Sequence, residues 1–180
     1  NSAGVDCSDN EVNIKIALGA EVARGALTMP NRDKLLASMT NDVGALVLED
    51  NRLQTLALSI AERGGAAALP LLTRLIEIFE AEGRLDRAVE GLASNDELLR
   101  RAQSGQGLTR PELAVLLATA KLWLQDAIEG VDTSDDAILA AGLSAAFPTA
   151  MQKNHAQAIE THQLRSQIIA TKLANRMVNR

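Results

Sequence analysis

The stretch TRPELAVLLATAKLWLQDAIE, Thr109–Glu129, decides the fold class of this chain. It opens with a threonine suited to a helix N-cap, a proline near the first helical position and Glu112 at the third, a combination typical of a helix start. Leucine and alanine, both strong helix formers, are frequent in the residues that follow. Because Gly130 then stops the pattern, the stretch predicts a long helix that ends near Glu129.

The composition extends this prediction to the whole chain. Hydrophobic residues make up 47% of the 180 residues but aromatic residues only 2%, namely Phe79, Trp123 and Phe147. The core must therefore be built from Leu, Ile, Val and Ala, and alanine lets helices approach each other closely. No run alternates apolar and polar residues for long enough to indicate a strand. We therefore expect an all-α fold, a multi-helix array of about eight to nine helices with no sheet.

Capping residues, glycines and apolar spacing place the other helices. We expect them at about 9–24, capped by Ser8, then 29–39, 42–63 and 67–81, one after Ser94, one from Thr133, and a pair from Pro148 that bends near 160–162 and ends near Asn179. Residues 104–107 are expected to form a flexible break. The side chains expected to be buried are Leu46, Leu53, Leu56, Ile60, Leu71, Leu72, Leu75, Ile76, Phe79, Leu164, Ile168, Ile169 and Leu173.

Charge and cysteine content exclude several classes of protein. The net charge of −5 and the pI of about 5.1 argue against nucleic-acid binding, which usually needs a basic surface. No stretch approaches 18 uncharged apolar residues, so we expect no membrane-spanning segment. A single cysteine, Cys7, cannot form a disulfide within the chain, which favours a reducing cytoplasm.

The first residues hold the strongest candidate for a binding site. Ser8-Asp9-Asn10-Glu11 has the form of a capping box, which places Ser8 at a helix N-terminus where a carboxylate or phosphate could be bound. From the residues alone, the simpler interpretation is that Ser8 only caps its own helix. Cys7 would lie at the same helix end, but without a positioned base it is interpreted as reduced and unreactive.

Other chemical motifs are weaker. His155 and His162 are seven residues apart, too far for the usual metal pair on a helix, so we interpret them as solvated surface residues. Gly105-Gln106-Gly107 lacks the rest of either phosphate-loop template and is interpreted as a linker. Asp135-Asp136 suits a helix N-terminus and needs no catalytic role. Judged by these motifs alone, the chain is a helical module without catalytic residues or a metal site.

Several longer strings resemble one family, the large bacterial NAD-specific glutamate dehydrogenases. They are NSAGVDCSDNEVNIKI at 1–16, EDNRLQTLALSIAE at 49–62, LTRPELAVLLATAK at 108–121, Phe147-Pro148, and IIATKLANRMVNR at 168–180. The first string also keeps part of a signature of the smaller glutamate dehydrogenases, Asn-Ala/Gly-Gly-Gly-Val-x-x-Ser-Tyr-Phe-Glu. It departs from that signature at Ala3 and at Asp9-Asn10, which replace a glycine and the aromatic pair.

The resemblance implies a function for the intact parent enzyme. That reaction converts L-glutamate, NAD and water to 2-oxoglutarate, ammonia and NADH. By the family's pattern, Asn1 would lie near the nicotinamide of NAD and Ser8 would hydrogen-bond the distal carboxylate of glutamate. The catalytic Lys and Asp and the dinucleotide-binding glycines match nothing here, so the chain is expected to be a fragment that starts at the last active-site loop. It would contain no catalytic residue, would not bind NAD by itself and would be inactive alone.

The resemblance also divides the chain. Residues 1–25 would end the catalytic domain, and 26–180 would form a C-terminal helical domain. We expect this helical domain to serve structure and oligomerisation, with the parent's other domains and a second copy of the parent as partners. The alternatives are a regulatory module that binds a small effector, and a helical adaptor unrelated to metabolism.

Overall fold

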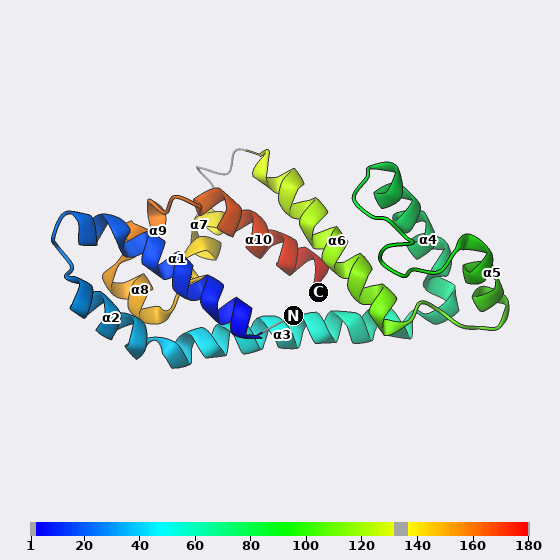
Figure 1. The fold of residues 1–180 in the computed structure, drawn as a ribbon, viewed down its shortest axis with the longest axis horizontal. Helices are drawn as coiled ribbons and strands as arrows, with labels where there is room; N and C mark the ends of the chain where they lie inside the picture. The colour runs from blue at the N-terminus through cyan, green and yellow to red at the C-terminus, as the bar shows by residue number, and fades with distance from the viewer. Residues whose placement is uncertain (1–2, 132–136, 180) are drawn as a thin grey trace. The chain divides into compact units, whose positions relative to one another are not determined.

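The computed structural model describes residues 3–131 and 137–179, and all the regular structure in them is helical (Figure 1). The all-α fold is therefore confirmed for this part of the chain, with one helix more than expected. The ten helices are α1 (Ala3–Ala23), α2 (Met29–Ser38), α3 (Thr40–Arg63), α4 (Gly65–Ala81), α5 (Asn95–Gln103), α6 (Arg110–Glu129), α7 (Ala137–Ser144), α8 (Thr149–Asn154), α9 (Ala156–Glu160) and α10 (Arg165–Val178). The expected start near Thr133 lies outside the described residues.

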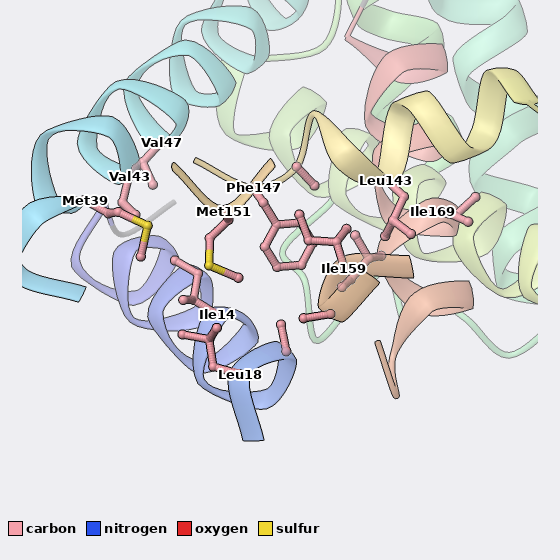
Figure 2. Close-up of a cluster of buried hydrophobic side chains, with 14 residues drawn as sticks. Ile14, Leu18, Met39, Val43, Val47, Leu143, Phe147, Met151, Ile159 and Ile169 are labelled. Atoms are coloured by element: carbon pink, nitrogen blue, oxygen red, sulfur yellow. The ribbon is translucent and has the colours of Figure 1, made fainter. Parts of the chain in front are cut away.

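The chain forms two compact units. The first unit comprises Asn1–Arg52 and Ile128–Leu173, and the second comprises Leu53–Ala127 and Ala174–Arg180. Buried side chains from α1, α3 and α7–α10 make the core of the first unit (Figure 2). The core of the second unit consists of Leu69, Ile76, Phe79, Leu85, Leu92, Leu98, Leu108, Leu113 and Leu116. The domain division after residue 25 stays a prediction.

Three of the expected helix starts carry the predicted hydrogen bonds. The hydroxyl of Thr28 accepts from the backbone N–H of Asn31 at 3.4 Å, and that of Ser94 accepts from Glu97 at 3.3 Å. At α6 the backbone N–H and the hydroxyl of Thr109 both donate to one carboxylate oxygen of Glu112, at 2.7 and 2.8 Å. The local capping signals therefore predict these starts correctly.

The predicted start of α1 is wrong. The helix is already formed at Ala3, so Ser8 lies inside it and is exposed. A capping box forms only where the preceding backbone is not helical, and nothing in residues 3–7 stops a helix. Glu11, the expected partner in the box, instead forms an ion pair with Lys15 one turn further along. The predicted stop is confirmed, because Gly25 follows the helix with a φ of +76°.

The predicted apolar faces are only partly correct. In α3 the buried residues are Val43, Val47 and Ala57, whereas Leu56 and Ile60 are 45% and 52% exposed. The other side chains of the expected set that are not buried are Leu46, Leu53, Leu72, Leu75 and Leu173, which are half-buried, and Leu71 and Leu164, which are exposed. In α10 the predicted burial of Ile168 and Ile169 is confirmed, and Ala170 and Ala174, which the prediction did not include, are buried as well.

The connection between α5 and α6 is a packed contact. Gly105, with a φ of +74°, follows the end of α5. A Cβ atom on Gly107 would lie 2.7 Å from the backbone carbon and oxygen of Gly65, at the start of α4. Residues 104–107 connect two helices as expected, but only glycine fits this close backbone approach.

Candidate functional site: the first helix

Ser8, the candidate substrate contact, lies in the second turn of α1. The free N–H groups of a helix belong to its first four residues, which here are Ala3–Asp6. The backbone N–H of Ser8 lies beyond them, within the helical hydrogen-bond pattern. The prediction that Ser8 lies at the N-terminal, positive end of a helix is therefore wrong. The side chain of Ser8 is exposed, however, and remains accessible to a ligand. Asn1 lies outside the described residues.

The charges on α1 around Ser8 are mostly negative. Residues 6–15 contain three acidic side chains, those of Asp6, Asp9 and Glu11, and one basic side chain, that of Lys15. Lys15 already forms its ion pair with Glu11, on the same side of the helix as Ser8 by spacing. A carboxylate bound at Ser8 would therefore need cationic groups from another part of the protein.

Cys7 lines a cavity between α1, α2 and the start of α3. The cavity has a volume of about 300 Å³, and its other lining residues are Glu11, Ile14, Leu36, Ala37, Thr40 and Val43. The cysteine is half-buried and free, and it lies within α1 rather than before its first residue. The prediction that Cys7 lies just before the helix end is therefore wrong.

Both histidines contact α1, and the interpretation as solvated surface residues is wrong. His155 lies between α8 and α9, with its Nδ1 3.0 Å from the carboxylate of Glu21. His162 is only 5% exposed, and its Nε2 lies 3.0 Å from the backbone oxygen of Asn13. Neither partner could be found from spacing, since each is more than 130 residues away in sequence.

The sequence analysis did not predict a polar network that surrounds Glu112 in the second unit. Besides the two bonds from Thr109, the buried carboxylate of Glu112 accepts from Arg101 at 2.8 Å and from the backbone N–H of Ala93 at 3.2 Å. Burial acts to raise the pKa of Glu112, but the hydrogen bonds from Thr109 and Arg101 and the charge of Arg101 outweigh it and hold the pKa below its usual value. One part of this network could have been found in the sequence: Glu97 lies four residues before Arg101 in a helix, and the two side chains form a second ion pair.

Two negative findings apply to the described residues. In residues 3–131 and 137–179, no three His, Cys, Asp or Glu side chains are grouped so that they could hold a metal ion. Within the same ranges, no helix has both the length and the apolar character needed to cross a bilayer.

Comparisons with known proteins agree with the sequence motifs. Residues 1–61 match the family "Bacterial NAD-glutamate dehydrogenase, catalytic domain", and residues 105–180 match "Glutamate dehydrogenase, C-terminal". The chain is 44% identical over 179 residues to the NAD-specific glutamate dehydrogenase of Pseudomonas aeruginosa. It is 41% identical to those of Halomonas elongata and Mycobacterium tuberculosis. Each match covers 99% of this chain but only 11% of the relative. The resemblance drawn from the motifs is therefore confirmed.

Proposed function

We propose that this chain, which corresponds to a segment of the bacterial NAD-specific glutamate dehydrogenases, works within a longer enzyme that oxidises L-glutamate. The enzyme would produce 2-oxoglutarate, ammonia and NADH, with NAD accepting the hydride, in the cytoplasm. The observation that carries this proposal is the match over 99% of the chain to three NAD-specific glutamate dehydrogenases. Similarity of this extent also argues against an unrelated helical adaptor.

The catalytic-domain match covers residues 1–61, the part of the chain that includes both candidate contacts. We assign Ser8 to the distal carboxylate of glutamate and Asn1 to the nicotinamide end of NAD. The acidic surroundings of Ser8 fit this assignment only if the cations that bind the carboxylate come from other parts of the enzyme. Gly105–Gly107 does not fit a dinucleotide, because Gly107 is packed against Gly65. We therefore assign the remaining NAD contacts and the catalytic groups to residues outside this chain.

For the helices after α1 we favour a structural and oligomerisation role. Large apolar side chains are exposed on α4, α5 and α6 of the second unit, including Leu71 at 72%, Leu99 at 60% and Leu122 at 61%. Exposed apolar residues that gather on a surface often mark contacts with another chain or domain. The partners would be other domains of the parent or a second copy of it.

The alternative of effector binding is favoured by one observation, the cavity beside Cys7. Its volume of about 300 Å³ is at the lower end of ligand pockets. A thermal-shift screen with amino acids and nucleotides tests this alternative. An effector at a hundredfold excess over its dissociation constant would stabilise the folded chain by about 2.7 kcal/mol. A structural module would show no such stabilisation.

The role of Ser8 is tested by Ser8→Ala in the whole enzyme. Loss of a hydrogen bond to a carboxylate is expected to lower kcat/KM for glutamate by roughly 10- to 100-fold, mainly through KM. The assay is NADH formation from glutamate. The control is Ser104→Ala, since Ser104 is exposed at the end of α5 and donates to a backbone oxygen of its own helix. An unchanged KM in Ser8→Ala would exclude the substrate contact, and no glutamate-dependent NADH formation by the unaltered enzyme would exclude the function.

A further inference from the structure

The two histidines of the chain hold the same helix at two points. His162 contacts Asn13 and His155 contacts Glu21, eight residues further along α1. Eight residues of helix correspond to roughly 12 Å, a little over two turns. Both contacts lie within the first unit and join α1 to the segment that contains α8 and α9.

The hydrogen bonds of His162 define its proton position. Its Nδ1 accepts from the backbone N–H of Leu164 at 3.0 Å, so in the neutral ring the proton must be on Nε2. That N–H then donates to the backbone oxygen of Asn13, 3.0 Å away. The carbonyl of Asn13 has two lone pairs, of which the helix uses one. His162 therefore takes the second lone pair without disturbing α1.

Packing restricts the ring of His162 to this orientation. The side chain is buried, and the ring of Phe147 lies 5.7 Å from it, centroid to centroid, with the planes tilted by 54°. Phe147 itself belongs to the core that receives Ile14 and Leu18 from α1 (Figure 2). The histidine thus links a polar atom of α1 to the turn before α10 across an otherwise apolar core.

We propose that His162 is a positioning residue for glutamate binding, because it fixes the placement of the helix that carries Ser8. This inference rests on the proposed function. Ser8 lies five residues before Asn13 on the same helix, so tilting or sliding of α1 moves its hydroxyl. His155 contacts the C-terminal end of α1 through Glu21, whereas His162 contacts α1 at Asn13, which is closer to Ser8.

Three substitutions separate the contacts of His162. His162→Phe keeps a ring beside Phe147 and removes both hydrogen bonds. His162→Gln carries an amide that reaches the position of Nε2 and donates to Asn13. His162→Asn carries an oxygen near the position of Nδ1 that accepts from Leu164 but does not reach Asn13. Glutamine should therefore restore the positioning, and asparagine should not.

The experiment measures steady-state kinetics of these variants in the whole enzyme. We expect His162→Phe and His162→Asn to raise KM for glutamate roughly five- to tenfold with KM for NAD unchanged, and His162→Gln to stay within twofold of the unaltered enzyme. The matched control is Ile169→Val, which trims a buried side chain of the same core and leaves the side chain of His162 unaltered. If the role of His162 were merely structural, His162→Phe and Ile169→Val would both lower the active fraction and leave KM for glutamate and KM for NAD unchanged. An unchanged KM for glutamate in His162→Phe, or failure of glutamine to restore it, would overturn the proposal.

A second measurement keeps this inference separate from the proposed function. If the unaltered enzyme forms no NADH from glutamate, the function fails, and hydrogen exchange of the α1 amides then decides whether His162 holds the helix. In that case His162→Phe should speed exchange at residues 14–20 roughly five- to tenfold more than Ile169→Val does. Equal exchange in the two variants would overturn the positioning role as well.

Discussion

Replacing Glu112 by glutamine should strongly destabilise the second unit. One carboxylate oxygen accepts from the backbone and hydroxyl of Thr109 and from Arg101, and the other accepts from Ala93. A glutamine has a single acceptor oxygen, so its amide group must face one of these donors. It also leaves Arg101 without its buried carboxylate. Removing one partner of a buried charged pair typically costs about 3–5 kcal/mol, and Arg101 keeps Glu97, so we expect about 3 kcal/mol.

The assay is urea unfolding followed by the fluorescence of Trp123, the single tryptophan of the chain. Its ring lies 6.2 Å from that of Phe79 in the core of the second unit, so its signal reports on this unit. The matched control is Glu97→Gln, which removes the half-buried carboxylate that pairs with the same arginine and should cost under about 1 kcal/mol. A loss below about 1 kcal/mol for Glu112→Gln would refute the reasoning.

The same network predicts a pH dependence. Because the pKa of Glu112 is lowered in the folded chain, its contribution to stability is complete above the ordinary glutamate pKa of about 4.3. Below that value the unfolded chain binds the proton first, and the contribution is lost as the pH falls through the lower folded pKa. The stability difference between the unaltered chain and Glu112→Gln should thus be constant from pH 7 to about 5 and shrink below about 4. A difference that grows on acidification would contradict this assignment.

Two further substitutions test close packing and bidentate pairing in the second unit. Gly107→Ala should lower the free energy of unfolding in urea by about 2 kcal/mol or more, because its Cβ would meet the backbone of Gly65. The control is Gly44→Ala in α3, which has open space around it and should be neutral or stabilising by up to about 1 kcal/mol. Equal effects of the two substitutions would contradict the close approach of Gly107 to Gly65. Arg87→Lys should cost about 1–2 kcal/mol, because lysine cannot reproduce the two bonds from Arg87 to Glu80 at 3.0 and 2.7 Å. A loss within about 0.3 kcal/mol would show that the paired geometry adds nothing.

The sequence predicted helices where the deciding groups are neighbours in the chain. Thr109 and Glu112 are three residues apart, and so are Ser94 and Glu97, and both starts form as expected. The same pattern at Ser8 failed, because a helix that has already formed outcompetes a cap inside it. Local signals are therefore reliable for helix starts only where the preceding chain is not helical.

Partners far apart in sequence could not be predicted in this way. The burial of His162 depends on Asn13, 149 residues away, so no spacing rule could distinguish it from a surface histidine. In α3 the apolar spacing predicted burial of Leu56 and Ile60, whereas the buried residues are Val43, Val47 and Ala57. Ile60 lies three residues after Ala57, on the same side of the helix, and is still 52% exposed, so only the packing of the neighbouring helices decides which apolar positions are buried.

The two units differ in how much of the chain the ribosome must synthesise before their cores can form. Most of the second unit is one continuous stretch, Leu53–Ala127, whose core residues are all present before α7 has been synthesised. The first unit instead needs α1–α3 together with Leu143, Phe147, Met151, Ile159 and Ile169. Its N-terminal helices must therefore wait, with Ile14 and Leu18 uncovered, for roughly 100 residues of further translation, about 5–20 s at ordinary translation rates. During that interval the nascent chain is most exposed to aggregation and to capture by chaperones.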